Sequence, residues 1–582
     1  MPSAVERVPQ HLRQFVVQQD YAAYDEVDQA VWRFVLLQTH ARLRRTAHPA
    51  YANGLAATGI SVERIPRIAD MDECLARFGW GAVCVDGFIP PRAFQEFQAA
   101  GLLPIAADIR QRRHLVYTPA PDIIHEAAGH APILPDPEYA AYLRRIGSVG
   151  AKAFSSAEDD RVYRAVFTLS ELKENPSATR ELVAAAEKDL ADALAGVTYC
   201  TEAGRLSRLY WWTAEYGLVG TPTDYTLYGA GLLSSLLESH SCHDASVKKI
   251  PLSSACVEVD YDITLPQPQL FVTGDFSQLR GVLDEVEKTL SSSIGGRTAL
   301  EAAQRSGEVA TLILDGGWSV LGKVSRVDLD GGEPVFFELS GPSAIAFSGK
   351  ILEGQGRAAH PQGFAVPLGR LESGALLADT AVEDLPRAAS MGTIRLVWRS
   401  GFSAEGRLAG VVPRPDDPSR VGLVLLERAK LWCRGELVGA SPRALSLVAA
   451  SALRTAHAGA ADPAYWPPTR FPSTSVPKLR ALSPEDAELL QLYERAIEVW
   501  RESRGPAVVP VFELVHEELE RRFPDEWLLR WNLLESLVKI GETGAFASRL
   551  RHELEALEDH HLGKEPILTG LRFLETVAES AG

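Results

Sequence analysis

The stretch PDIIHEAAGHAP, residues 121–132, places two histidines around a glutamate in a segment of small residues that looks like the start of a helix. In the zinc-protease pattern His-Glu-x-x-His, the two histidines stand four apart on one helical face. Here His125 and His130 stand five apart, which is about 140° around an ideal helix. The extra residue argues against a zinc protease and indicates a different arrangement.

Two histidines and one carboxylate on one face of a metal form the site of non-haem Fe(II) oxygenases, which leaves the opposite face open for oxygen and substrate. Gly129, directly before His130, would allow a local irregularity that lets the two histidines converge. Asp122 precedes His125 by three residues, and we expect it to fix the tautomer of that imidazole through a hydrogen bond. A structural or capping role for the histidines stays open on this pattern alone.

The third ligand of such a site is expected in an otherwise apolar segment, and SRLYWWTAEYGLVG, residues 207–220, offers Glu215. A lone glutamate among tyrosines and tryptophans is costly to bury unless it is paired or bound to a metal. The alternative is that Glu215 lies on a hydrated helix face while the aromatic residues form core.

The composition of the whole chain restricts the classes of function. Its 582 residues predict two to four domains. The formal net charge of −17 argues against a general binder of nucleic acid or of anionic membranes, since both need basic surfaces. The chain has no apolar run of transmembrane length and no apolar signal core, and its six cysteines form no CxxC pair. We therefore expect a cytoplasmic protein without a disulfide framework.

The spacing of hydrophobic residues divides the first three quarters of the chain into two regions. Residues 1–290 are mostly helical, with apolar residues at helical spacing in segments such as 26–45 and 178–197. Residues 305–450 alternate between apolar and polar, and the Asp-Gly-Gly at 330–332 is a hairpin turn signal. The pattern predicts a helical domain followed by a β-rich domain.

The remainder begins with a linker. Residues 461–478 carry five prolines and predict a stiff connection. Residues 480–582 return to helix, with Ser483 and Pro484 as the expected N-cap and first helical residue. The segment 523–557 resembles a helical hairpin of the repeat-protein kind. We expect a packed helical appendage, with a protein partner contact or self-association as the alternative.

Four segments become recognisable when they are taken together and in order. They are GFIPPRAF (87–94), IRQRRHLVYTPAPDIIHEAAGH (109–130), YWWTAEYG (210–217) and YGAGLLSS (228–235). With them, the sequence resembles the pterin-dependent aromatic amino acid hydroxylases. The resemblance implies the mainly α-helical catalytic domain of that family for the first 290 residues of a multidomain protein.

The resemblance also implies which residues form the site. His125, His130 and Glu215 match the iron ligands of the family. Arg110 matches the arginine that holds the substrate carboxylate, a task suited to a bidentate guanidinium. Other positions that match the amino-acid pocket are Thr118, Pro121, Trp211, Gly231 and Ser234. The positions that match the surroundings of the pterin are Ile89, Phe94, Glu126 and Tyr210, with Phe94 expected to stack on the ring.

By this resemblance the chain is expected to be a monooxygenase that uses O2, Fe(2+) and tetrahydrobiopterin, or a related tetrahydropterin, to hydroxylate free L-phenylalanine to tyrosine. Trp211 stands where tryptophan-specific members tend to carry phenylalanine, and Val272 stands where tyrosine enzymes are acidic. Both features favour phenylalanine. A tyrosine or tryptophan hydroxylase and a meta-hydroxylating phenylalanine enzyme stay open as alternatives. A non-catalytic scaffold is the alternative from another class, and the intact ligand set together with Arg110 argues against it.

Three features depart from the family pattern. Pro91 stands where many relatives have a serine that can hydrogen-bond the pterin, and Tyr216 replaces the usual phenylalanine after the ligand glutamate. Between His130 and Glu215 lie 84 residues, many more than in the animal members. The excess, near residues 152–205, is charged and helical, and we expect an inserted helical pair that flanks the pocket mouth as a lid.

Overall fold

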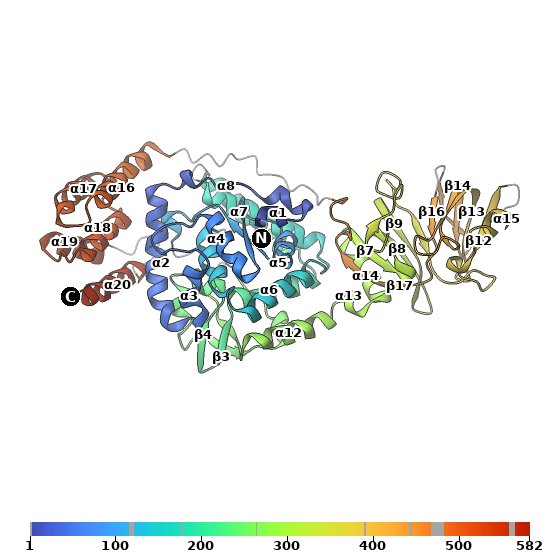
Figure 1. Ribbon diagram of the computed structural model, residues 1–582, viewed down its shortest axis with the longest axis horizontal. Coiled ribbons are helices and arrows are strands. Elements are labelled where there is room, and N and C mark those ends of the chain that lie inside the picture. The colour runs from blue at the N-terminus through green and yellow to red at the C-terminus, as the bar shows by residue number, and fades with distance from the viewer. Residues whose placement is uncertain are drawn as a thin grey trace.

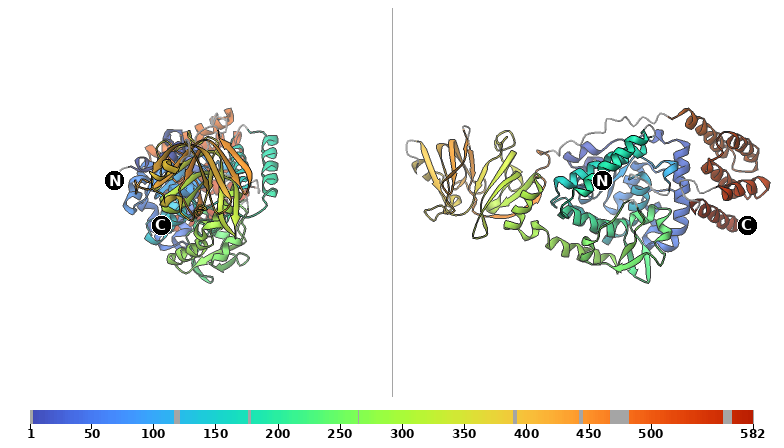
Figure 2. Two further views of the ribbon diagram at one scale, coloured as in Figure 1. Left: turned by 90° about the vertical axis from the view of Figure 1, so that its right-hand side faces the viewer. Right: turned by 180° about the vertical axis from the view of Figure 1, so that it is seen from behind.

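The structure is a computed structural model, and it describes residues 3–115, 121–175, 178–263, 265–388, 392–441, 445–466, 482–557 and 565–581. Three parts follow one another along the long axis of the molecule (Figure 1). A helical N-terminal region lies in the middle, a β-rich region lies at one end, and the C-terminal helices lie at the other end. The view from behind shows the same order (Figure 2).

The N-terminal region is built mainly from helices around one hydrophobic core. Its helices of at least two turns are α2 (Glu26–Thr46), α3 (Pro49–Ala57), α4 (Ile68–Leu75), α5 (Pro91–Ala99), α6 (Pro137–Gly150), α7 (Ala157–Glu174), α8 (Arg180–Ala195), α9 (Glu202–Tyr210) and α12 (Phe276–Lys288). Its short helices are α1 (Ala4–Arg7), α10 (Ala230–Ser234), α11 (Glu238–Ser241) and α13 (Ser291–Ile294). The helices expected within 26–45 and 178–197 are confirmed as α2 and α8.

Helix α2 shows why these segments fold as they do. Asp25 caps its N-terminus by accepting the backbone N–H groups of Val27 and Asp28, and Asp28 returns the contact in a capping box. Trp32 and Phe34 are fully buried, so α2 runs through the core and not along its surface.

Two small sheets in this region were not expected from the helical pattern. Strands β1 (Gly81–Val85) and β2 (Leu102–Ala106) pair in parallel. A four-stranded sheet has the order β4-β3-β6-β5. Its strands are β3 (Leu218–Thr221), β4 (Asp224–Leu227), β5 (Lys248–Pro251) and β6 (Gln269–Thr273). All are four or five residues long, which is too short for a clear alternation.

The β-rich region begins after helix α14 (Gly296–Ser306). One sheet contains β7 (Ala310–Leu314), β8 (Trp318–Asp330), β9 (Glu333–Phe347), β10 (Lys350–Ile351), β11 (Ala365–Pro367) and β17 (Leu453–Ala458). The other contains β12 (Thr393–Val397), β13 (Phe402–Pro413), β14 (Val421–Cys433), β15 (Glu436–Ser441) and β16 (Leu445–Val448). Gly331 and Gly332, both with positive φ, turn β8 into β9 as the hairpin signal predicted. The last strand ends at Ala458, beyond the expected boundary at 450.

The C-terminal helices are α16 (Pro484–Glu502), α17 (Val509–Arg522), α18 (Trp527–Lys539), α19 (Ala545–Ala556) and α20 (Glu565–Ala581). Ser483 caps α16 by accepting the N–H of Asp486, and Pro484 is its first residue, as predicted. The predicted hairpin of 523–557 corresponds to α18 and α19. Most of the predicted linker, residues 467–478, lies outside the described residues. Among the helices that are described, none is both long and apolar enough to cross a bilayer.

Candidate metal centre and cavity

The segment that carries both histidines, η5 (Ile124–His130), is a π-helix. Its hydrogen bonds run from residue i to residue i+5, so residues five apart lie above one another on one face. The rings of His125 and His130 accordingly approach to 5.1 Å between centroids. The expected local irregularity is therefore present, in the form of a widened helical turn.

Gly129 contributes to this segment through its small size. It is not among the glycines with positive φ. A Cβ at Gly129 would lie 2.7 Å from the carbonyl oxygen of Ala230 in α10. The glycine therefore permits η5 to pack closely against α10.

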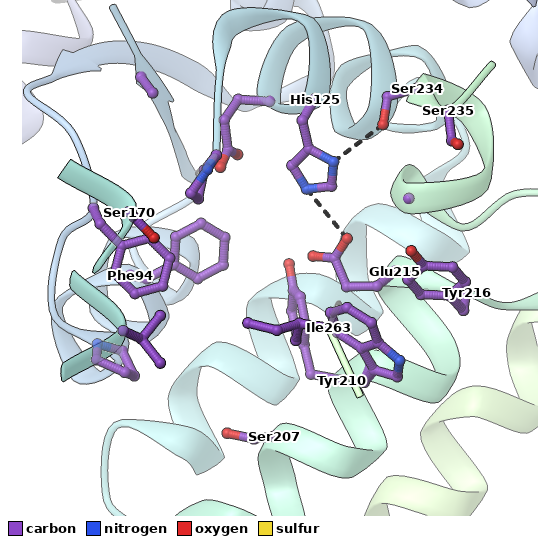
Figure 3. A pocket seen from close by; sticks show the side chains of 18 of the residues that line it. Phe94, His125, Ser170, Ser207, Tyr210, Glu215, Tyr216, Ser234, Ser235 and Ile263 are labelled. Carbon is purple, nitrogen blue, oxygen red and sulfur yellow. Dashed lines mark hydrogen bonds and ion pairs between the residues drawn. The ribbon is translucent and has the colours of Figure 1, made fainter. Parts of the chain in front are cut away.

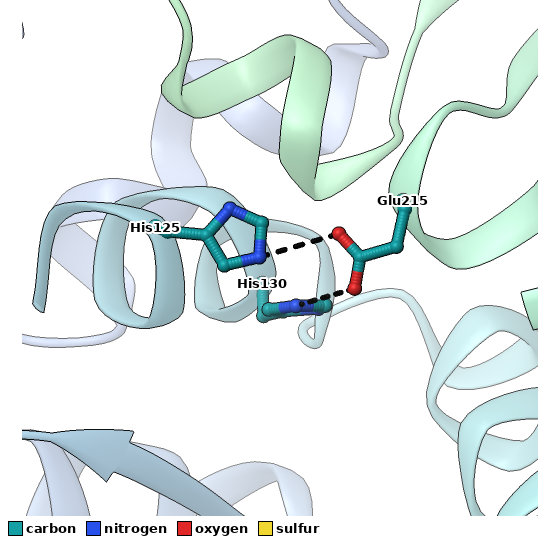
Figure 4. A group of neighbouring side chains, drawn as sticks. All are labelled: His125, His130 and Glu215. Carbon is teal, nitrogen blue, oxygen red and sulfur yellow. Dashed lines mark ion pairs between the residues drawn. The ribbon is translucent and has the colours of Figure 1, made fainter. Parts of the chain in front are cut away.

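Glu215 is the last residue of a second π-helical segment, η7 (Trp211–Glu215), and it faces both histidines (Figure 4). Its Oε2 lies 3.3 Å from Nε2 of His125, and its Oε1 lies 3.2 Å from Nε2 of His130. One ligand atom from each residue fits within 4.8 Å of the others. Glu215 is only 8% exposed, so the alternative of a hydrated helix face is wrong.

The electrostatics of this cluster fit a bound cation. Burial alone would lower the pKa of His125, but the negative charge of Glu215 raises that pKa to about 9. Burial would raise the pKa of Glu215, but His130 and His125 hold it far below its usual range. Apart from the ion-pair contacts inside the cluster, both ring nitrogens of His130 and the Oε2 of Glu215 are buried without a hydrogen-bond partner among the described residues. Two imidazoles and a carboxylate with such unpartnered atoms suit a divalent transition metal.

The tautomer of His125 is fixed by Ser234, and the prediction that Asp122 fixes it was wrong. Nδ1 of His125 lies 3.1 Å from Oγ of Ser234. The Ser234 hydroxyl donates to the carbonyl oxygen of Ala230 at 2.8 Å, so it accepts the Nδ1–H of the ring. In the neutral ring this tautomer leaves Nε2 without a proton, as a metal ligand requires.

Asp122 is instead the partner of Arg110. Its carboxylate accepts from Nε and Nη2 of Arg110 at 2.8 and 2.9 Å, and from the backbone N–H of Arg110 and of His125 at 3.0 Å each. Asp122 and Arg110 are 2% and 3% exposed. Burial would raise the pKa of Asp122, but the guanidinium keeps that pKa below its usual range. Both carboxylate oxygens of Asp122 are thus occupied by these donors, and neither accepts from the imidazole of His125.

A cavity of about 460 Å³ opens beside the cluster (Figure 3). Its lining includes His125 and Glu215 and every candidate for the amino-acid and pterin sites that the structure describes. These candidates are Arg110, Pro121, Trp211, Gly231, Ser234, Ile89, Phe94, Glu126 and Tyr210. Thr118 lies outside the described residues. Val272 is buried in β6 and is not among the lining residues, so its apolar character says little about the ligand.

All four pterin candidates line this cavity, and two of them are in contact with each other. Phe94 meets Tyr210 edge-on at 5.9 Å, and Gln98 donates to the hydroxyl of Tyr210 at 2.6 Å. Glu126 is buried, its Oε2 lies 4.0 Å from Nε2 of His130 and has no hydrogen-bond partner among the described residues, and burial raises its pKa. A flat heterocycle with polar edges could stack on Phe94 and satisfy Glu126.

The inserted helix α7 forms part of the same wall. Val166 and Ser170 of α7 line the cavity, and Figure 3 shows Ser170 beside Phe94. Tyr163, one turn earlier, stacks on Phe88 at 5.6 Å and donates to its carbonyl oxygen at 2.9 Å. Sequence reasoning placed the insertion near the pocket mouth but did not identify these residues.

The other part of the cavity is aromatic. Trp211 stacks on Tyr261 at 4.3 Å with an interplanar angle of 10°. The additional hydroxyl of Tyr216 donates to Oε2 of Glu238 at 2.7 Å. Tyr261 and Glu238 were missed from the sequence, although a buried hydroxyl at position 216 needs a partner and so signalled that an acceptor lies nearby.

A second group with metal-ligand chemistry lies in the C-terminal helices. His516, Glu520 and Glu553 bring ligand atoms within 4.8 Å of one another. Glu553 already accepts from Nε2 of His516 at 2.7 Å and from Nε of Arg530 at 3.1 Å. Because the guanidinium balances the charge of Glu553, this group is a structural ion-pair network.

The fold and the first cluster define a class of protein, in which a mainly helical domain presents two histidines and one carboxylate to a largely apolar cavity. The family model described as biopterin-dependent aromatic amino acid hydroxylase matches residues 17–170 and 183–297. The chain belongs to this family, and the resemblance drawn from the sequence is confirmed.

Two curated relatives agree with this assignment. Phenylalanine-4-hydroxylase of Ralstonia nicotianae is 30% identical over 268 residues, which are 46% of this chain and 72% of the relative. The enzyme of the same name from Pseudomonas aeruginosa is 28% identical over 258 residues, 44% of this chain and 81% of the relative. A crystal structure of Chromobacterium violaceum phenylalanine hydroxylase with bound iron(III) and 7,8-dihydrobiopterin is 26% identical and covers 50% of this chain and 92% of that chain, with a TM-score of 0.38.

Proposed function

We propose that the chain is an iron- and tetrahydropterin-dependent monooxygenase that hydroxylates the ring of free L-phenylalanine to give tyrosine. The observation that carries the proposal is the convergence of His125, His130 and Glu215 beside a cavity that also holds Arg110. The names of the matched relatives, phenylalanine-4-hydroxylases, support phenylalanine as the substrate.

Each part of the site has a task under this proposal. His125, His130 and Glu215 would hold Fe(2+) from one side, with Ser234 keeping the Nε2 of His125 free to bind. Arg110 is already oriented by Asp122, so it would bind the substrate carboxylate without first giving up rotamer freedom. The substrate ring would lie toward the aromatic part of the cavity.

Bound iron and tetrahydropterin would together activate O2, with the pterin supplying two electrons and accepting one oxygen atom while the other enters the ring. The protein contributes orientation and the exclusion of water. Phe94 and Tyr210 would hold the pterin ring, with Ile89 against it and the carboxyl of Glu126 toward a polar edge. Trp211 and Tyr261 shield the reacting ring from solvent.

The choice of ring is the finer part of the proposal. The lining of the cavity is mostly aromatic and aliphatic, which suits an unsubstituted phenyl ring. Glu238 is a carboxylate beside the aromatic part of the cavity, but its Oε2 already accepts from Tyr216 and its Oε1 accepts the backbone N–H of Gln267 at 3.1 Å. A carboxylate occupied in this way gives no reason to prefer the hydroxyl of tyrosine or the indole N–H of tryptophan.

An aerobic assay with Fe(II), tetrahydropterin and each aromatic amino acid separately tests the function. We expect pterin oxidation coupled to tyrosine formation with phenylalanine, with the ring position of the hydroxyl read by NMR. Meta-hydroxylated product, or faster turnover of tyrosine or tryptophan, would change the substrate. If none of the three amino acids stimulates pterin oxidation, the enzymatic proposal is wrong and a scaffold role is favoured.

A further inference from the structure

The C-terminal helices share one hydrophobic core with the N-terminal region, and α2 lies at the contact. The ring of Phe34 in α2 packs edge-on against Trp527 and Trp531 of α18, at centroid distances of 4.8 and 4.9 Å. Gly570 of α20 comes so close that a Cβ there would lie 2.7 Å from Nε1 of Trp531. Because buried aromatic pairs dominate core energetics, the C-terminal helices are a fixed part of the fold.

Ion pairs surround this apolar contact, and the cation comes from α2 in one pair and from a C-terminal helix in another. Arg33 of α2 donates to Glu535 of α18 at 2.7 Å, and Lys539 contacts the same carboxylate at 2.9 Å. Arg501 of α16 donates to Glu26 of α2 at 2.8 Å. These pairs fix how α16 and α18 lie along α2.

One further ion pair joins the C-terminal helices to the segment that carries Arg110. Arg112 contacts the carboxylate of Glu526 and lies 3.6 Å from Asp486. The side chain of Glu526 is 4% exposed. Glu526 caps α18 and accepts from the hydroxyl of Tyr493 at 2.7 Å. A carboxylate this deeply buried needs a cation, and Arg112 is the cation that contacts it.

Arg112 begins η4 (Arg112–His114), directly beyond the candidate substrate arginine. Arg110 is held on one side by Asp122, and its Nη1 lies 3.5 Å from the carbonyl oxygen of Leu115, the residue that follows η4. Since η4 connects Arg110 to Leu115, a shift of η4 moves the arginine together with this carbonyl. The contact of Arg112 with α18 therefore influences the guanidinium two residues away.

We infer that the C-terminal helices brace the substrate-binding segment, and that Glu526 is a positioning residue that acts on Arg110 through Arg112. The inference rests on the proposed role of Arg110 in binding the substrate carboxylate. Because η4 adjoins Arg110 and none of the pterin candidates, the brace affects amino-acid binding selectively. The C-terminal helices thus influence the reaction, although they lie far along the chain from the proposed metal ligands.

The test uses the full-length, iron-loaded protein with Arg112→Gln, which removes the cation and leaves Glu526 in place. Coupling between sites typically changes affinity by about 5- to 150-fold, and an effect that passes through one residue belongs at the lower end. We expect the KM for phenylalanine to rise about fivefold to tenfold, with kcat and the KM for the pterin within about twofold of wild type. Arg112→Lys keeps a charge and should restore most of the affinity.

Arg501→Gln is the matched control, because it removes an arginine from the same interface without touching η4. We expect its kinetic constants to stay near those of the wild-type protein. In a Glu526→Gln background, Arg112→Gln should add little, since both changes break one contact. Amide exchange of residues 109–115 should accelerate in Arg112→Gln and not in Arg501→Gln, whether or not substrate turns over.

The outcomes separate the two proposals. If wild-type protein hydroxylates no amino acid but exchange at 109–115 still responds to Arg112→Gln alone, the proposed function fails and the structural brace stands. If exchange and the KM for phenylalanine are both unchanged in Arg112→Gln, there is no brace. An equal rise in the amino-acid and pterin KM values would indicate general loosening and would also overturn the inference.

Discussion

Replacing Asp122 with asparagine keeps the size of the side chain and removes its charge. In the folded protein Asp122 accepts two hydrogen bonds from the guanidinium of Arg110, at 2.8 and 2.9 Å, and both residues are almost completely buried. The amide of asparagine offers one acceptor oxygen, and its NH2 group would face the guanidinium donors. Arg110 would be left as an uncompensated buried charge.

Breaking a buried ion pair by removing one partner costs about 3–5 kcal/mol. Domain stabilities are about 5–15 kcal/mol, so the change removes a large share of the total unless Arg110 moves. Opening of the segment around residues 121–130 would become roughly 100- to 5,000-fold more frequent, because each 1.4 kcal/mol is about tenfold. If Arg110 turns toward solvent instead, the loss of stability will be smaller and the KM for phenylalanine will rise.

Amide hydrogen exchange of residues 121–130 and the KM for phenylalanine measure the two consequences. Asp275→Asn is the control, because Asp275 is an exposed N-cap of α12 and asparagine caps helices about equally well. Unchanged exchange and an unchanged KM in Asp122→Asn would show that Arg110 does not depend on its buried partner. The proposal that Asp122 orients Arg110 for the substrate carboxylate would then be wrong.

Three other predictions concern the metal, the insertion and pH. Glu215→Gln removes the proposed anionic ligand, and we expect Fe(II) affinity, measured by equilibrium dialysis, to fall by more than about 100-fold. Replacing residues 157–195 by a short linker removes Val166 and Ser170 from the cavity wall. We therefore expect the variant to have a higher KM for the pterin than the wild-type protein in steady-state assays. Burial lowers the pKa of His360 from 6.5 to about 4, so between these values the unfolded state binds a proton that the folded state does not. His360 should therefore contribute a loss of about 2 kcal/mol in the stability of the β-rich region between pH 8 and pH 5 in urea unfolding, and His360→Asn should remove this contribution.

Each of these predictions has a result that contradicts it. Stoichiometric iron in Glu215→Gln would remove that carboxylate from the metal site. Unchanged kinetics after deletion of residues 157–195 would show that α7 and α8 have no role as a lid. Equal stability of the β-rich region at pH 5 and pH 8 would mean that His360 is accessible to protons in the folded state.

The cluster of candidate metal ligands could be predicted from the sequence, because residue type and order carry most of the information. A histidine pair with unusual spacing and one glutamate in an apolar segment were enough to nominate His125, His130 and Glu215. The π-helix that makes the spacing work was not predicted, since i→i+5 hydrogen bonding leaves no periodic trace in so short a segment.

Contacts over long sequence separations were the ones that local reasoning missed. Asp122 was assigned to the nearby imidazole, whereas its partner is Arg110, 12 residues away. Ser234 reaches His125 from 109 residues away. Helical periodicity predicted α16 and α18. Nothing in their sequence pattern indicates that their apolar faces pack against α2.

The shared core of α2 and the last helices has a consequence for biosynthesis. A ribosome releases the chain from its N-terminus, so Phe34 leaves the exit tunnel long before Trp531 has been translated. Until then the outer face of α2 stays exposed, which is a state prone to aggregation. We therefore expect a premature stop codon that removes α18 to leave this apolar face of α2 uncovered, even though most of the chain, including the candidate site, has been translated.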